Sequence, residues 1–238
     1  MKKIFITFIA AGLAISGLSS CGLSCKKGSG NTTTDSRKVE DFTKIDISGG
    51  YKVVLKQDSS LSVAITTDDN LQQYVKTSVS GSTLKISSKK NICASGETTV
   101  LIGLRHVEDI EASGAVEIRS DGKLVTQNLD ISLSGAGKVD LDLNAAKVHT
   151  KGSGATELKF RGQASSHSIE LSGTGKVDAL DFVVGSYVIE TSGASESNIN
   201  VLKSLIVKTS GTSNVRYRGN PTTVKNQESG ASSVKKID

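Results

Sequence analysis

The sequence predicts an all-β chain that folds over most of its length as a parallel β-helix, a solenoid. A short motif, Ser-Gly followed by a small residue, recurs every 18 to 21 residues through the second half of the chain. Around each copy, apolar and polar residues alternate with the period of two that is typical of strands. The 238 residues include one proline, no tryptophan and only 4% aromatic residues, which suits a thin core of aliphatic side chains.

The motif defines a repeat. It begins at Ser113, Ser134, Ser153, Ser172, Ser192, Ser210 and Ser229, and an earlier copy at Ser48 stands apart. Paired-helix repeats need about 33 residues or more, so this period is too short for them. Glycine supplies the backbone freedom for a tight bend. The pattern therefore predicts rungs of about 19–20 residues, each with two strands joined at the Ser-Gly corner and stacked about 4.8 Å apart.

Three positions of the repeat, counted from the serine as zero, are mostly apolar and are expected to form the core. They are Ile110, Ile131, Thr150, Ile169, Ile189, Val207 and Asn226 at −3; Ile118, Val139, Leu158, Val177, Ser197, Val215 and Val234 at +5; and Leu141, Phe160, Ala179, Ile199 and Tyr217 at +7.

The positions between these columns carry charges that change sign from rung to rung. Position +4 reads Glu117, Lys138, Glu157, Lys176, Glu196 and Asn214, and position +6 reads Arg119, Asp140, Lys159, Asp178, Asn198 and Arg216. Stacked rungs would place opposite charges beside each other, which favours a sheet. One register thus explains both a core and a solvent face, and it places the rungs at residues 106–238.

Residues 39–105 are less regular and predict a β-rich N-terminal cap that covers the first rung, whose open edge would otherwise invite aggregation. An early strand pair is expected around Phe42 to Leu55, and a further strand at Leu61 to Ile65. A short helix is expected after Thr67 or Asp68, and a hairpin at Val79 to Ile86.

The first residues have the form of a secretory signal. Lys2 and Lys3 precede an apolar run that is too short to cross a bilayer. The run from Leu18 to Cys21 resembles a bacterial lipobox, which implies cleavage between Ser20 and Cys21, and lipid attachment at Cys21. The alternatives are lipidation at Cys25, or an ordinary signal with an incidental cysteine. The expected organisation is a signal peptide at 1–20 and a flexible Gly/Ser/Thr-rich tether at 21–38.

The ordered set "DFTKIDISGGYKVVLKQ", "GSTLKIS" and the Ser-Gly-Ala rungs resembles the head-GIN-domain family of putative auto-transporter adhesins, from about Phe42 to the C-terminus. The resemblance implies a right-handed β-helix in a secreted or lipidated protein of Bacteroidota-type bacteria, and it brings no catalytic residues. Surface lipoproteins of such bacteria tend to carry acids just after the cysteine. Residues Gly22 to Lys27 contain none, so an outer-membrane lipoprotein facing the periplasm is expected.

An enzyme is the alternative, because parallel β-helices also include polysaccharide lyases and hydrolases. Its candidate residues are Asp140, Asp142, Asp178, Asp181, Lys138 and Lys176, and the charge alternation already accounts for four of them. We therefore expect no catalytic residues. Fold alone does not decide function.

No metal or cofactor is expected either. His106, His149 and His167 fall in different columns, and Cys21, Cys25 and Cys93 lack zinc-site spacing. Cys25 and Cys93 are expected as separate thiols, because Cys25 falls in the tether; a disulfide is the alternative.

The predicted function is a lipid-anchored, non-enzymatic binding or structural protein of the cell envelope, with a protein or glycan ligand. Loss of Lys2 and Lys3 lowers the net charge from +5 to +3, too little for a nucleic-acid footprint. The last rung, from Ser229 to Asp238, lacks an evident terminal cap, so pairing with a second copy is possible.

Overall fold

The computed structural model describes residues 24–238, and the predicted signal peptide and Cys21 lie outside them. The described chain is all-β apart from one 3-10 helix, as predicted. Its elements are β1 (Lys26–Lys27), β2 (Thr32–Lys38), β3 (Lys44–Gln57), β4 (Ser62–Asp68), the 3-10 helix η1 (Asp69–Tyr74), β5 (Val75–Ser80), β6 (Thr83–Ser88), β7 (Ile92–Cys93), β8 (Thr99–Leu104), β9 (Asp109–Arg218), β10 (Thr223–Gly230) and β11 (Ser233–Lys236).

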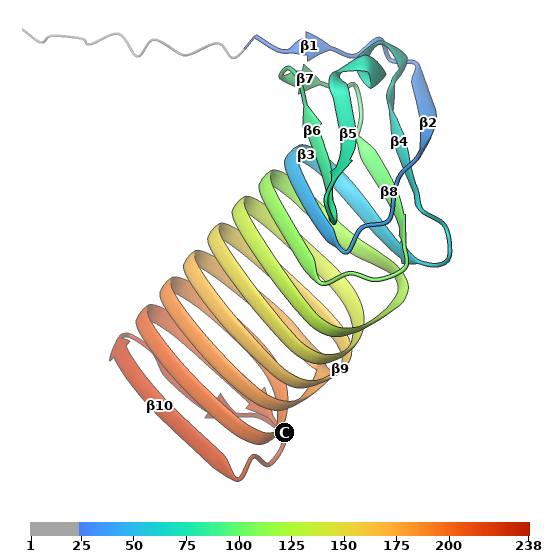
Figure 1. Cartoon of the computed structure of the whole chain (residues 1–238). Coiled ribbons are helices and arrows are strands. Elements are labelled where there is room, and N and C mark those ends of the chain that lie inside the picture. The colour runs from blue at the N-terminus through green and yellow to red at the C-terminus, as the bar shows by residue number, and fades with distance from the viewer. Residues whose placement is uncertain (1–23) are drawn as a thin grey trace, which may run out of the picture.

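A long coil makes up most of the molecule. Figure 1 shows β9 winding through successive turns that lie side by side, with β10 at the far end. The turns pair in parallel, since β3 pairs with the start of β9, and both β10 and β11 pair with its end. Ser48 lies opposite Ser113, and Ser210 opposite Ser229. The serine motifs of β9 and β10 are therefore in register, as the sequence predicted, and Ser48, which the sequence set apart, joins the same row. We refer to β9, β10 and β11 as the coil.

Stacked glycines form one corner of the coil. Gly154 has φ +98°, in the region that favours glycine. A Cβ at this position would collide with the carbonyl oxygen of Gly135 in the preceding turn, and Gly173 stacks on Gly154 in the same way. The corner therefore needs glycine both for its backbone conformation and for the close approach of neighbouring turns.

The predicted core columns are buried. All residues at positions −3, +5 and +7 of the first turns lie in the core, whereas Asn226 of the last turn is exposed and Val234 and Tyr217 are half-buried. Every residue of β10 is exposed. The core therefore thins toward the C-terminal end of the coil.

One polar pair lies within this core. Thr150 and His167 are both buried, and their side chains form a hydrogen bond of 3.0 Å. Phe160, Phe182 and Tyr187 surround the imidazole, with ring centroids 5.1–5.8 Å away. Burial lowers the pKa of His167 to about 3, and nearby His149 contributes. The histidine is therefore a neutral part of the core.

Strands β1, β2 and β4–β8, together with η1, form a cap on the first turn. Parallel β6 and β8 cover one edge of β3, whose other edge pairs with β9. The antiparallel pairs β2–β4, β4–β8 and β5–β6 complete the cap. The expected hairpin at 79–86 is present as β5–β6, and the expected short helix is η1. The early strand pair is the single strand β3, which bends at Gly49.

The prediction of a flexible tether at 21–38 is wrong for its described part. Residues Thr32–Lys38 form β2, which pairs along its whole length with β4. Polar side chains gave no sign of this strand, because all of β2 is exposed or half-buried and it adds no column to the core. Backbone pairing with β4, rather than apolar burial, orders the segment.

The prediction of separate thiols is also wrong, because Cys25 and Cys93 form a disulfide with Cα atoms 5.6 Å apart. Short parallel pairing of β1 with β7 places Lys27 opposite Cys93 and brings the two cysteines together. Asp68 fixes the same segment, since its buried carboxylate accepts hydrogen bonds from Ser95 and from the Gly30 N–H. The bonds from Ser95 hold the pKa of Asp68 below its usual range.

Within residues 24–238, no helix is long and apolar enough to cross a membrane.

Candidate functional site

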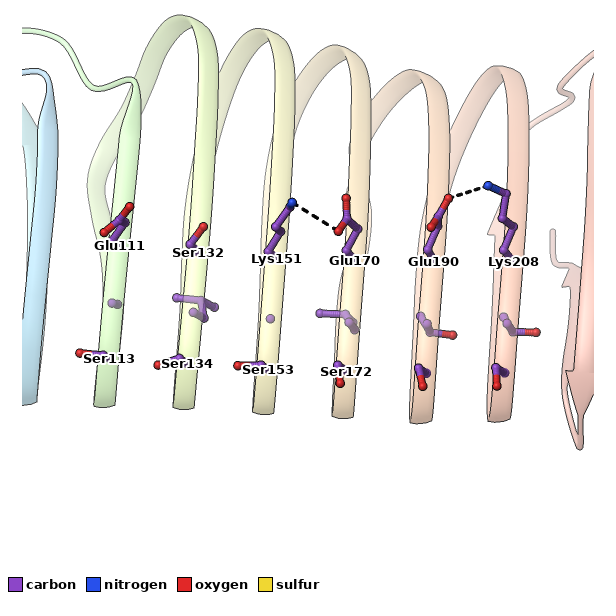
Figure 2. A pocket seen from close by; sticks show the side chains of 18 of the residues that line it. Glu111, Ser113, Ser132, Ser134, Lys151, Ser153, Glu170, Ser172, Glu190 and Lys208 are labelled. Atoms are coloured by element: carbon purple, nitrogen blue, oxygen red, sulfur yellow. Dashed lines mark hydrogen bonds and ion pairs between the residues drawn. The ribbon is translucent and has the colours of Figure 1, made fainter.

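A groove of about 870 Å³ runs along the coil and crosses successive turns. Three parallel rows of side chains line it, two of which are labelled in Figure 2. The charged row, at position −2, is Glu111, Ser132, Lys151, Glu170, Glu190 and Lys208; the floor row, at −1, is Ala112, Leu133, Gly152, Leu171, Thr191 and Thr209; the serine row, at zero, is Ser113, Ser134, Ser153, Ser172, Ser192 and Ser210.

Strand alternation explains the groove. Successive side chains point to opposite faces, so the charged and serine rows point outward on either side of an inward floor row. The floor fits a narrow corner by pairing large residues with glycine: Leu133 occupies the space beside Gly137, and Leu171 the space beside Gly175. The floor is therefore recessed, and the two outward rows form its walls.

Ion pairs between neighbouring members of the charged row neutralise most of its charges. The ammonium of Lys151 lies 3.5 Å from the carboxylate of Glu170, and that of Lys208 lies 2.8 Å from Glu190 (Figure 2). Glu111 lies beside Asp46 of β3, and neither forms an ion pair within residues 24–238. Lys85 of β6 lies opposite Asp46 on its other side, so the end of the groove nearest the cap carries two carboxylates against one lysine and is acidic.

A hydroxyl in the floor lacks a partner. Thr209 is 5% exposed, and its Oγ1 accepts and donates no hydrogen bond within the described chain. In the turn before it, by contrast, the hydroxyl of Thr191 bonds to Ser213 at 2.8 Å. A buried polar group without a partner costs free energy. Thr209 therefore leaves one unsatisfied hydroxyl on the inward side of the groove floor.

The enzyme candidates do not line the groove. Lys138 pairs with Glu157 at 3.7 Å, a contact between neighbouring turns that agrees with the predicted charge alternation. Asp140 lies 2.6 Å from Arg161, and Asp142 lies 3.8 Å from Lys123. The remaining candidates, Asp178, Asp181 and Lys176, are exposed. The structure does not bring the six residues into one cleft.

The histidines are likewise dispersed. His106 is exposed, His149 lies 3.3 Å from Glu170, and His167 is buried in the core. Residues 24–238 contain no group of three His, Cys, Asp or Glu side chains arranged to hold a metal ion.

Comparison with known families identifies the chain. Residues 41–221 match the family described as "Putative auto-transporter adhesin, head GIN domain". The chain belongs to this family. The resemblance carried by the β3 sequence and the Ser-Gly rungs is therefore confirmed.

Solved structures share this head GIN fold. A putative adhesin from Bacteroides fragilis is 23% identical, with a TM-score of 0.84 over 89% of this chain and 99% of that one. A putative adhesin from Parabacteroides distasonis is 21% identical, with a TM-score of 0.71 over 90% and 100%. A protein of the same species entitled putative lipid binding protein is 19% identical, with a TM-score of 0.74 over 90% and 100%. Curated proteins gave no match.

Membership of the head GIN family and the Cys25–Cys93 disulfide both indicate an exported protein, since disulfides persist in oxidising compartments.

The groove of this head GIN domain was not predicted, although position −2 carried a signal. Read down the repeat, that position gives Glu111, Ser132, Lys151, Glu170, Glu190 and Lys208, a polar column like those at +4 and +6. Periodicity alone does not reveal that this surface is concave, because concavity depends on how floor side chains such as Leu133 and Leu171 pack inward beside glycines.

Proposed function

We propose that the protein is a lipid-anchored, non-enzymatic binding protein of the cell envelope. Its coil is a right-handed parallel β-helix that holds an extended segment of a protein ligand along the groove. The groove is the observation on which this rests, because its three rows run across at least six turns and continue in the same register throughout.

The chemistry of the groove favours a polypeptide ligand. Serine hydroxyls along one wall can donate to and accept from a peptide backbone. Asp46 and Glu111, free of ion pairs within residues 24–238, would attract a lysine or arginine side chain at the cap end. No aromatic side chain is among the lining residues, so the groove lacks the flat rings on which sugars stack.

The carboxylates of the groove support binding rather than catalysis. Glu170 and Glu190 are each held by a lysine of the neighbouring turn. Three of the enzyme candidates, Lys138, Asp140 and Asp142, are divided among separate ion pairs outside the groove. A general acid or base would instead need a carboxyl group aimed at a shared substrate position.

The anchor proposed here is lipid on Cys21, after cleavage at Ser20, in an outer-membrane lipoprotein that faces the periplasm. Support comes from the lipobox-like sequence, from the family and from the absence of acids in residues 22–27. Mass spectrometry of the protein purified from membranes tests it directly: an acyl group on Cys21 is expected, and an unmodified N-terminus there would exclude the anchor.

Binding to the groove is tested with fluorescently labelled peptides of about ten residues, in matched basic, neutral and acidic series. Fluorescence anisotropy should show binding of the basic series to the wild-type protein. Ser153→Tyr fills the middle of the groove and should abolish it. Ser165→Tyr is the control, since Ser165 is also an exposed serine of the coil but lies outside the groove.

Two outcomes would overturn the proposal. Binding that Ser153→Tyr and Ser165→Tyr weaken equally would exclude the groove. Cleavage of an envelope polysaccharide that Asp140→Asn abolishes would instead establish a glycan-active enzyme.

A further inference from the structure

The N-terminal segment is fixed at one end of the molecule. Cys25 is covalently joined to Cys93, the Lys26 N–H donates to the Asn91 carbonyl at 2.8 Å, and the Gly28 N–H donates to the Cys93 carbonyl at 2.9 Å. In Figure 1, β1 and β7 lie at the cap end, far from β10 and the C-terminus. The chain therefore enters the fold at the end of the cap.

Buried hydrogen bonds to Asp68 also hold the N-terminal segment in place. Its carboxylate is 2% exposed and accepts the Gly30 N–H at 2.7 Å, the Ser95 N–H at 2.9 Å and the Ser95 hydroxyl at 2.6 Å. These bonds join the entering segment to the loop after β7, and they add to the disulfide. The segment from Cys25 onward therefore moves with the cap.

Little chain remains between this attachment and the proposed anchor. Cys21 and Cys25 are four residues apart, and each residue spans at most about 3.8 Å, so the two Cα atoms are at most about 15 Å apart. If Cys21 carries lipid, as proposed above, the end of the cap lies at the membrane surface. The predicted 18-residue tether would have allowed much greater separation.

The surface at this end is basic. Lys26 and Lys27 of β1 and Lys89 and Lys90 before β7 are exposed, and none forms an ion pair within residues 24–238. They are neighbours, because Asn91, which follows Lys90, accepts the Lys26 N–H. We refer to these four residues as the lysine end.

Acids near the lysine end are already engaged. Asp68 is buried with Ser95, and Asp69 accepts hydrogen bonds from the Ser29 hydroxyl and the Asn70 N–H. Glu97 lies 3.1 Å from the ammonium of Lys52. Neutral donors leave the charges of Asp68 and Asp69 in place, so the four lysines outnumber two carboxylates and the surface where the chain enters the fold keeps a net positive charge.

We propose that the lysine end is a docking surface for anionic phospholipid headgroups, and that it sets the coil on end, pointing away from the membrane. Basic residues near an anionic surface each strengthen attraction, and the effect falls off within about 8 Å at physiological ionic strength. The short link to Cys21 holds the lysine end close enough to the membrane for the lysines to come within that range. The groove then runs outward from its acidic end, beside the cap, toward β10.

Vesicle binding tests the surface independently of lipidation. The mature chain, residues 21–238 with Cys21→Ser and therefore without lipid, should sediment with vesicles containing 30% phosphatidylglycerol and not with phosphatidylcholine alone, and 0.5 M salt should release it. Replacing Lys26, Lys27, Lys89 and Lys90 by Gln should weaken binding at least tenfold, because each lysine near the surface contributes about fivefold.

The control removes the same charge from the other end. Lys203, Lys225, Lys235 and Lys236 are exposed residues of the coil near its C-terminal end, and their replacement by Gln should leave binding within about twofold of wild type. Equal weakening by both sets would show an effect of net charge alone and would overturn the proposal. So would equal binding to both kinds of vesicle.

Orientation is tested in the lipidated protein. The chain contains no tryptophan, so a single tryptophan reports its own position. Brominated lipid should quench Asn91→Trp, beside the lysine end, but not Asn220→Trp, between β9 and β10. Equal quenching would mean that the coil lies flat. Absence of lipid on Cys21 would remove the proposed anchor, yet the vesicle experiment would still decide whether the lysine end binds lipid.

Discussion

The cap and the coil are both built of strands, but different kinds of contact hold each together. In the coil, each turn pairs with another turn about 19 residues away, and the same corner, core columns and outward rows recur. In the cap, every contact occurs once: β2 pairs with β4, Cys25 joins Cys93, and the Arg37 guanidinium donates to the Val75 carbonyl at 2.9 Å.

Because of this difference, a destabilising substitution should affect more of the structure in the coil than in the cap. A repeat array gains its stability from interfaces between neighbours, so a fault at one turn weakens two interfaces of the coil. Faults in the cap should remain local, provided that β6 and β8 continue to cover β3.

The largest effect is expected at the glycine corner. Gly154→Ala places a methyl group against the Gly135 carbonyl at φ +98°, so the backbone must change conformation or the turns must separate. We expect the free energy of unfolding to fall by about 3–5 kcal/mol, as measured by urea denaturation.

Gly122→Ala is the matched control. Gly122 also has positive φ, +87°, but nothing lies within 4 Å of a Cβ there. Gly122→Ala should lower the free energy of unfolding by about 1–2 kcal/mol, from backbone conformation alone. Equal losses at Gly122 and Gly154 would show that stacking between turns adds nothing to the cost.

A more local effect, of similar size, is expected in the cap. Replacing Cys25 and Cys93 by serine removes a disulfide between residues 68 apart in the sequence. From the entropy of the opened loop, the free energy of unfolding should fall by about 4 kcal/mol. Hydrogen exchange read by mass spectrometry should show faster exchange in β1, β7 and the loop after β7 that contains Ser95, while the amides of β9 keep their protection. Equal loss of protection along β9 would show that the cap and the coil unfold as one unit.

The coil and the cap also differ in how much of their structure could be predicted from the sequence. The sequence placed Ile131, Leu158 and Val177 in the core correctly, because each belongs to a column that repeats. It missed β2 and the Cys25–Cys93 disulfide because each rests on one long-range pairing. Strands of two residues, such as β1 and β7, carry no periodicity from which a pairing can be read.

The groove could be predicted from the sequence only in part. Its charged and serine rows repeat, so the sequence contains them, and the ion pair between Lys208 and Glu190 could have been anticipated from their alternation. The unpartnered hydroxyl of Thr209 could not, because it differs from Thr191 only in whether another side chain reaches it.

The mildest test concerns the polar pair in the core of the coil. Thr150 and His167 stand where the same columns elsewhere carry Ile131 and Leu205. Replacing both partners of a buried hydrogen bond by apolar residues of similar size is nearly neutral. The double variant Thr150→Val with His167→Leu should therefore be about as stable as wild type at pH 7.

The two proteins should diverge as the pH falls. In the folded state the pKa of His167 is about 3, whereas in the unfolded chain it is near its ordinary value of about 6.5. Between these values only the unfolded state binds the proton, so acid favours unfolding, and wild type should lose about 1.4 kcal/mol per pH unit through this residue. Relative to the double variant, that amounts to about 2 kcal/mol at pH 5. All other ionisable groups are common to the two proteins, so the difference between them reports on His167. Urea denaturation at pH 7, 6 and 5 measures this difference in the free energy of unfolding. A difference that does not change with pH would mean that water reaches the imidazole and that the coil is open at this turn.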